Sequence, residues 1–317
     1  MAKKNQNNLK YKVSLNLGGG AGRGLAHIGV LKGLEEQKVP YDIIIGVSMG
    51  AFIGSIYSVE PDADFVKNQV KYLVDSQEFR STLVGSYSKS LKASEGVLEK
   101  LNKVYYQGHM ARRLLTKPGI SPNNEMEDSF KKVVANIDIA NTKIPFATTA
   151  VCLETGESKV FTKGSLLKTV MASGTIPMIF PPQKIGDYNY VDGGVLDKIG
   201  IDVAKSLRVK TTIVFDVSNS TLGSDNSKNA LDVMVRSSDI ASIYRRKKQQ
   251  DEASLVLFPI QGNYHWADFT ILEEMYEMGY ECVTKNIECI RHTIKATNPF
   301  RKYFTFFSKN RLPATLE

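Results

Sequence analysis

The sequence predicts an α/β fold in three layers, with helices on both faces of a mainly parallel central sheet. Segments rich in Val, Ile and Thr alternate along the chain with segments whose apolar residues recur at helical spacing. The strand-like segment at residues 43–46 is apolar nearly throughout, which is typical of strands buried on both faces of a parallel sheet. No repeat or low-complexity linker interrupts the 317 residues, so we expect one large domain.

The composition narrows the class of protein. A hydrophobic content of 42% is ordinary for a globular chain, and the net charge of +8 favours anionic surfaces. No apolar run approaches the length of a membrane span, and no apolar segment follows the basic N-terminus as in a secretory signal. The three cysteines do not form a disulfide framework. We therefore expect a reduced, cytoplasmic protein without a cofactor or metal, and without a nucleic-acid motif.

The first half of the chain is expected to open with two βα units. A strand at residues 11–17 is followed by the glycine loop GGGAGRG and a helix at 25–37. A second strand at residues 42–46 leads into a Gly-x-Ser-x-Gly turn and another helix. Residues 61–135 are expected to be mostly helical.

The second half continues the alternation. The pattern predicts strands at residues 143–154 and 158–162, an edge strand in YNYVDGG, and further strands at 211–218 and 254–260. Helices are expected at residues 165–174, 201–207, 227–250 and 267–295.

The stretch IGVSMGAFIG contains the first candidate for chemistry. A serine between two glycines, where a strand gives way to a helix, is typical of a nucleophile elbow, which would expose Ser48 Oγ above the helix N-terminus. Gly46 and Gly50 would allow the strand and helix backbones to approach closely. The alternative is an ordinary turn that contains serine.

The glycine loop has two interpretations. Such a loop after a strand can bind a dinucleotide, but the expected acidic residue at the end of the second strand is missing, since Asp42 stands at its start. The other interpretation is an oxyanion hole made of backbone amides. Because the two glycine motifs open consecutive βα units, their loops should meet at one edge of the sheet, which favours a hydrolase.

The class of hydrolase follows from the order of the motifs. Only one strand precedes the elbow strand, so Ser48 comes too early for an α/β-hydrolase. The four histidines, His27, His109, His265 and His292, lack the context of a catalytic loop, although a triad through His265 stays open. A mechanism without histidine is therefore favoured.

Four segments, in order, carry a more specific resemblance: GGGAGRGLAHIGVLKGLEE, GVSMGAFIGSIYS, ASGTIPMIFPP and YVDGGVLDKIGIDVA. This arrangement resembles the patatin-like phospholipase family, and its bacterial cytosolic-type members most of all, over residues 11–285. The resemblance implies a three-layer α/β/α fold and a Ser-Asp dyad that cleaves acyl esters of lipids without a metal.

Carried over by position, the resemblance makes Ser48 the nucleophile and Asp192 its acidic partner. It assigns the oxyanion hole to Gly19, Gly20, Ala21 and Gly22. The supporting residues are expected to be Arg23, Gly24, Gly46, Gly50, Gly193 and Gly194. One position departs from the family, which often has glycine where this chain has Ala21. Alanine keeps the amide, but a positive φ there would be costly.

Local sequence leaves two of these residues with alternatives. Asp192 could belong to a simple Asp-Gly turn, although Asp187, Asp197 and Asp202 lack its following glycine pair. Arg23 opposes the macrodipole at a helix start, so it could brace the loop or contact a phosphate or acyl carbonyl, or be an exposed solubilising charge. Ser173 and Pro177 match a family S-x-x-x-P stretch and are expected to shape the wall near Asp192.

The predicted function is therefore hydrolysis of acyl esters of lipids or phospholipids. The alternatives are a soluble acyl esterase or thioesterase, and a non-catalytic lipid-binding regulatory module. We expect a polar tail at residues 1–10, a catalytic domain at 11–297 and a basic, aromatic tail at 298–317. That tail, or RRKK at 245–248, could contact an anionic membrane surface. The alternative for the tail is packing on the core, and the alternative for RRKK is a favourable interaction with the helix dipole.

Overall fold

A computed structural model describes residues 11–81, 112–113, 116–121, 125–218 and 227–296. Eight strands form one sheet: β1 (Val13–Leu17), β2 (Ile43–Gly46), β3 (Phe146–Cys152), β4 (Ser158–Phe161), β5 (Gln183–Ile185), β6 (Tyr188–Asp192), β7 (Thr211–Phe215) and β8 (Leu255–Leu257). Strands β1, β2, β3, β7 and β8 are parallel neighbours, whereas β4, β5 and β6 pair antiparallel. The sheet is therefore mixed but mainly parallel, as predicted.

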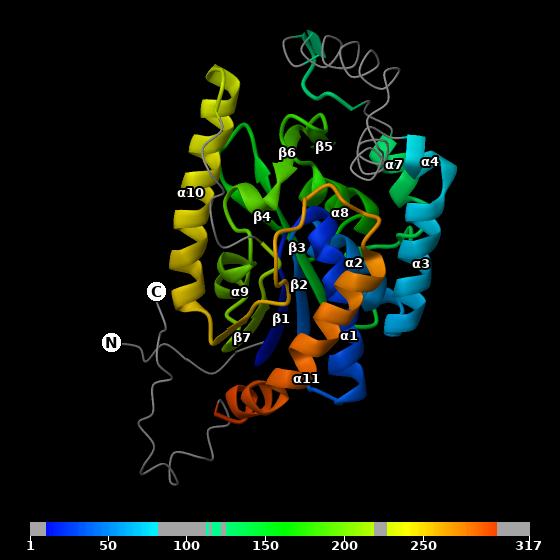
Figure 1. Cartoon of the computed structure of the whole chain (residues 1–317), viewed down its shortest axis with the longest axis vertical. Coiled ribbons are helices and arrows are strands. Elements are labelled where there is room, and N and C mark those ends of the chain that lie inside the picture. The colour runs from blue at the N-terminus through cyan, green and yellow to red at the C-terminus, as the bar shows by residue number, and fades with distance from the viewer. Residues whose placement is uncertain (1–10, 82–111, 114–115, 122–124, 219–226, 297–317) are drawn as a thin grey trace.

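Over the described residues, helices cover the sheet in the order that the sequence predicts (Figure 1). Residues 82–111, in the region expected to be mostly helical, lie outside the described part of the chain. They are α1 (Ala26–Glu36), α2 (Met49–Val59), α3 (Ala63–Asp75), α4 (Gln77–Ser81), α7 (Glu125–Phe130), α8 (Leu166–Gly174), α9 (Ile201–Ser206), α10 (Ala230–Glu252) and α11 (Leu272–Ala296). Three short 3-10 helices, η1 (Ala21–Leu25), η2 (Ile139–Asn141) and η3 (Gly193–Val195), lie between them.

The sheet is buried on both faces because its side chains alternate between two cores. In β2, Ile44 packs into the large core that α1, α2 and α11 share, whereas Ile43 and Ile45 pack with Val203 of α9 on the opposite face. The three-layer α/β/α prediction is confirmed.

Strand β6 is not the edge strand that the sequence predicts. Its residue Asn189 pairs with Lys184 of β5, a three-residue strand that lies on the side of β6 away from β3. Strand β5 was not predicted. Three residues are too few to show the alternation by which strands are recognised. The edge of the sheet is therefore β5.

The register of β3 explains how two distant segments meet. Strand β4 pairs with Thr148–Val151 along one edge of β3. Both β2 and β6 also pair with residues in that stretch, so these two strands must lie along the other edge of β3. Gly46, the last residue of β2, pairs with Thr148, and Asp192, the last residue of β6, pairs with Ala150. The two strands run towards each other along one edge. The chain that leaves β2 therefore emerges beside Asp192.

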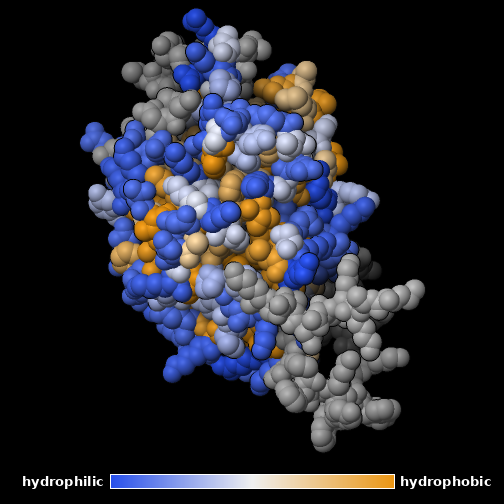
Figure 2. Space-filling view, turned by 180° about the vertical axis from the view of Figure 1, so that it is seen from behind, coloured by the Kyte–Doolittle hydropathy of each residue, from blue (hydrophilic) through white to orange (hydrophobic). Residues whose placement is uncertain are grey.

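The outer surface carries hydrophobic side chains at the start of α10. Val233 is 54% exposed and Met234 is 58% exposed, and Leu231 and Val235 are also exposed. Figure 2, the view from behind, shows hydrophobic surface among hydrophilic residues, including a patch at the upper right. In the described part of the chain no helix is both long and apolar enough to cross a membrane.

Candidate functional site

Ser48 lies in a strained turn between β2 and α2. Its backbone has φ 54° and ψ −121°, a conformation that costs a non-glycine residue about 1–3 kcal/mol. The Ser48 amide donates a hydrogen bond of 3.0 Å to Ser173 Oγ on α8, which helps to hold the turn. The side chain is thereby fixed at the N-terminus of α2.

The two glycines of the elbow fit where no side chain could. A Cβ on Gly46 would lie 2.5 Å from Ala51 Cα, and a Cβ on Gly50 would overlap the carbonyl oxygen of Leu17. Strand and helix therefore approach as closely as their backbones allow. Both residues hold the turn in the geometry that the motif predicts.

Asp192 lies beside Ser48 in a buried position. Only 6% of the residue is exposed, and the Ser48 side chain lies close enough to its carboxyl group to lower the pKa of that group. The Gly194 amide also donates to Asp192 Oδ1, at 2.7 Å. A Cβ on Gly193 would overlap the Thr149 carbonyl oxygen, so the glycine after Asp192 is required for the loop to pack against β3.

The environment of Asp192 sets its proton affinity. Burial raises the pKa of Asp192 to about 6, against the Ser48 hydroxyl, the Gly194 amide and the positive charge of Lys198, which lower it. A carboxylate with a pKa near 6 is mostly ionised at neutral pH, yet it binds a proton more tightly than an exposed carboxylate does. Such a group can accept the proton of a neighbouring hydroxyl.

The glycine loop abuts Ser48, but its amides are used differently. The amide of Gly19 donates to the Lys198 carbonyl at 2.9 Å, and that of Gly22 donates to the Trp266 carbonyl at 2.7 Å. In the described residues, the amides of Gly20 and Ala21 have no backbone acceptor. These two amides are available to an oxyanion, whereas those of Gly19 and Gly22 hold the loop in place.

Ala21 adopts the positive φ that the sequence analysis identified as costly. Its φ is 48°, which an alanine tolerates at a cost of about 1 kcal/mol. The residue begins η1, and Arg23 donates its amide to the Gly20 carbonyl at 3.2 Å. The loop thus stores strain at the position where this chain departs from the family.

His27 supports the loop and does not act as a base on Ser48. Its Nε2 lies 2.8 Å from the Gly18 carbonyl oxygen, and because a carbonyl only accepts, Nε2 carries the hydrogen. Burial lowers the pKa of His27 to about 4, so the ring is neutral.

Three further residues at the site were not assigned from the sequence. Met49 is the first residue of α2, so its amide is one of those that a helix leaves without an internal partner. The rule that the residue after an elbow nucleophile supplies an oxyanion donor could have identified it. Ser173, expected only to shape a wall, contacts the Ser48 amide, and Lys198 approaches both loops. No local pattern indicates these two contacts.

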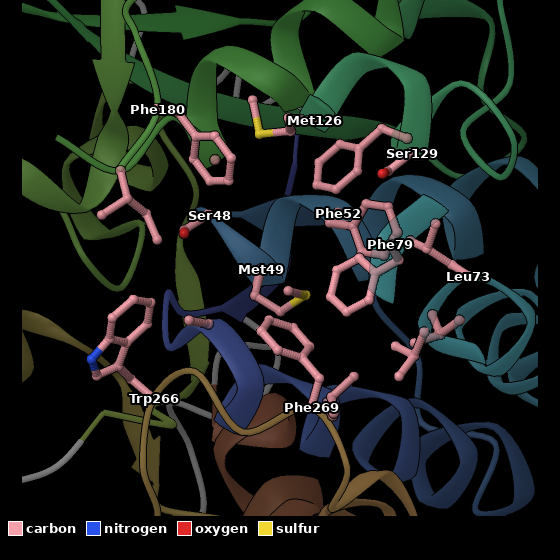
Figure 3. Close-up of a pocket in the computed structure, with 17 residues that line it drawn as sticks. Ser48, Met49, Phe52, Leu73, Phe79, Met126, Ser129, Phe180, Trp266 and Phe269 are labelled. Carbon is pink, nitrogen blue, oxygen red and sulfur yellow. The ribbon is translucent and has the colours of Figure 1, made fainter. Parts of the chain in front are cut away.

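An apolar pocket begins at Ser48 (Figure 3). It encloses about 80 Å³, and Ser48 lies at one side of it while Leu73 and Phe79 lie at the other. Its apolar lining includes Met49, Phe52, Leu73, Phe79, Met126, Phe130, Phe180, Trp266 and Phe269. Such a lining suits an acyl chain.

No group of three metal-binding side chains lies together in the described ranges. The fold and the site define an α/β protein in which a strained serine at a strand–helix elbow lies beside a buried aspartate. The family model described as Patatin-like phospholipase matches residues 15–205. The chain belongs to this family, which confirms the resemblance seen in the sequence.

Two known relatives are much longer proteins. The chain is 30% identical over 208 residues to human patatin-like phospholipase domain-containing protein 6, a match that covers 65% of this chain and 13% of that protein. It is 24% identical over 294 residues to lysophospholipase NTE1 of Kluyveromyces lactis, covering 84% of this chain and 18% of that protein. The chain thus spans less than a fifth of the length of these relatives.

Among solved structures, the chain is similar to VipD from Legionella pneumophila and to the type III effector protein ExoU. For VipD the TM-score is 0.42 at 14% identity, with 90% of this chain and 67% of VipD covered. For ExoU the TM-score is 0.37 at 11% identity, with 89% and 53% covered.

Proposed function

We propose that the chain is a serine acyl hydrolase of lipid esters, with lysophospholipids as a substrate class. The observation that carries the proposal is that Ser48, in its strained turn, stands beside the buried carboxyl group of Asp192 and lowers the pKa of that group. The apolar pocket beside Ser48 and the lysophospholipase activity named for a relative support the substrate class.

In the proposed reaction, Ser48 Oγ attacks the ester carbonyl while Asp192 accepts its proton. The amides of Gly20 and Ala21, with that of Met49, stabilise the oxygen that becomes negative. Collapse of the tetrahedral intermediate breaks the bond to the alcohol, which takes the proton from Asp192. A water molecule then attacks the acyl-enzyme and gives its proton to Asp192, which passes it to Ser48 Oγ as the bond between Ser48 and the acyl group breaks and the fatty acid leaves.

A fluorophosphonate probe tests the assignment of the nucleophile. We expect mass spectrometry to find the label on Ser48 of the wild-type protein and to find none on Ser48→Ala. In Asp192→Asn labelling should slow by about 100-fold or more, since general base catalysis contributes roughly that much. His27 is not part of this mechanism.

The same labelling distinguishes the alternatives. Folded protein that takes no label would favour a lipid-binding module without catalysis. Labelled protein that hydrolyses short soluble esters but no lysophospholipid would favour a soluble esterase or thioesterase.

A further inference from the structure

Three cationic side chains gather behind the glycine loop. Arg23 is 8% exposed and Arg246 only 3% exposed, and Lys198 is partly buried between them and Asp192. The Nε of Arg246 lies 3.4 Å from Asp216 Oδ2, and the negative charge of Asp216 also raises the pKa of Arg23. The charge of Asp216 therefore acts on all three cations.

This arrangement leaves positive charge at the site. The second carboxylate, Asp192, is the proposed proton acceptor and is neutral for part of the reaction. Burial lowers the pKa of Lys198, and the charges of Arg246 and Arg23 lower it further against those of Asp216 and Asp192, so the two arginines act on Lys198 as like charges. Buried charge of one sign is costly unless an opposite charge accompanies it, so the site favours an anionic ligand.

Lys198 is the cation placed to meet such a ligand. A Cβ on Gly19 would lie 3.8 Å from Lys198 Cγ, and a Cβ on Gly194 would lie 3.7 Å from the same atom. The side chain therefore passes between the glycine loop and the loop that follows Asp192. Within the described residues, no carboxylate forms a salt bridge with its ammonium group.

The position of the pocket gives the orientation of a substrate. The apolar pocket extends from Ser48 towards Phe52 and Phe79, and Lys198 is not part of its lining (Figure 3). An ester whose acyl chain fills the pocket places its alcohol portion on the other side of Ser48. In a lysophospholipid, that portion carries the phosphate.

We propose that the ammonium group of Lys198 binds the phosphate of a lysophospholipid and selects phosphate-bearing esters over neutral ones. This inference rests on the hydrolase function proposed above. Arg23 and Arg246 contribute positive charge near the phosphate, whereas Lys198 makes the contact with it. Arg246 already pairs with Asp216, and both arginines are almost fully buried.

The test compares two esters with the same acyl chain, a lysophosphatidylcholine and a monoacylglycerol, on wild type and Lys198→Met. The assay is run near pH 7.5, which is above the pKa of about 6 of Asp192 and no more alkaline than that requires, because the pKa of Lys198 is lowered. We expect kcat/KM for the lysophospholipid to fall by about 10- to 100-fold, the range for a charge-assisted hydrogen bond, and to change little for the monoacylglycerol.

Two further variants complete the design. Lys198→Arg should retain most of the preference, and Lys163→Met, at an exposed lysine between β4 and α8, should leave both esters unaffected. Equal loss on both esters would show that Lys198 acts through Asp192 or the loop, and no loss on either would exclude a phosphate contact. If the wild-type protein hydrolyses neither ester and Ser48 takes no label, the hydrolase proposal fails first.

Discussion

At the scale of single residues, the carboxyl group of Asp192 links function to stability. Its folded-state pKa of about 6 lies above the value of 3.8 for an exposed aspartate, so the folded chain binds the proton more tightly than the unfolded chain. Ionising Asp192 therefore lowers the free energy of unfolding as pH rises from 3.8 to 6. Above pH 6 the full penalty is present, and below 3.8 it is absent.

Asp192→Asn removes this penalty. The difference between a pKa of about 6 and one of 3.8 corresponds to roughly 3 kcal/mol, so we expect the variant to be more stable than wild type by up to that amount at pH 8. The gain should disappear at pH 4. Urea unfolding at both pH values measures it.

The exposed Asp187→Asn serves as the control, with little change at either pH. A variant at Asp192 that is no more stable than wild type at pH 8 would contradict the raised pKa. Ser48 illustrates the same relation between function and stability, because its positive φ would favour glycine while the proposed chemistry needs the hydroxyl.

At the scale of elements, α1 and α11 cross with their backbones in contact. A Cβ on Gly29 would overlap the Tyr276 carbonyl oxygen, and a Cβ on Gly279 would overlap that of Ala26. Both clashes are with backbone, so rotating a side chain cannot relieve them. We expect Gly29→Ala and Gly279→Ala each to lower the free energy of unfolding by about 3 kcal/mol.

Gly174→Ala in α8 is the matched control. The nearest atoms to its added Cβ, in Met126 and Phe130, are 3.9 Å away, so alanine fits and should be neutral or slightly stabilising. Chemical denaturation of the three variants compares them directly. If Gly29→Ala were as stable as Gly174→Ala, the close crossing would be wrong.

The sequence indicates these elements with different success, for physical reasons. The long helices and the apolar strands were predicted because periodicity and burial are local properties. Strand β5 was not predicted. The acceptors of the Gly19 and Gly22 amides could not be predicted either, because Lys198 and Trp266 are distant from these glycines in sequence. The pairing of Ser48 with Asp192 came from a family resemblance. Its structural cause, the shared edge of β3, depends on register that one sequence does not contain.

At the scale of the whole molecule, the proposed hydrolysis of lipid esters requires a chain of net charge +8 to contact a lipid surface. The basic segment RRKK at 245–248 is only partly available for contact with an anionic membrane surface, because Arg246 is buried against Asp216 and Arg245 donates to the Val195 carbonyl. The tail at residues 298–317 lies outside the described residues, so its membrane role stays a prediction from sequence.

Removal of residues 298–317 tests that role. We expect the truncated protein to sediment less with vesicles that contain phosphatidylserine, and binding of the full chain to weaken as salt rises from 50 to about 500 mM. The substitution Met234→Ser, on the exposed start of α10, is the comparison. Unchanged sedimentation of a folded truncation would exclude the tail as the contact.

The shared edge of β3 also has a consequence for biosynthesis. Ser48 leaves the ribosome before Asp192, which follows 144 residues later and reaches Ser48 only once β6 has paired with β3. At about 5–20 residues per second, that interval lasts roughly 7 to 30 s. In the proposed mechanism a nascent chain therefore carries its nucleophile without a base. Unfinished protein is unable to attack the lipids of the cell that is making it.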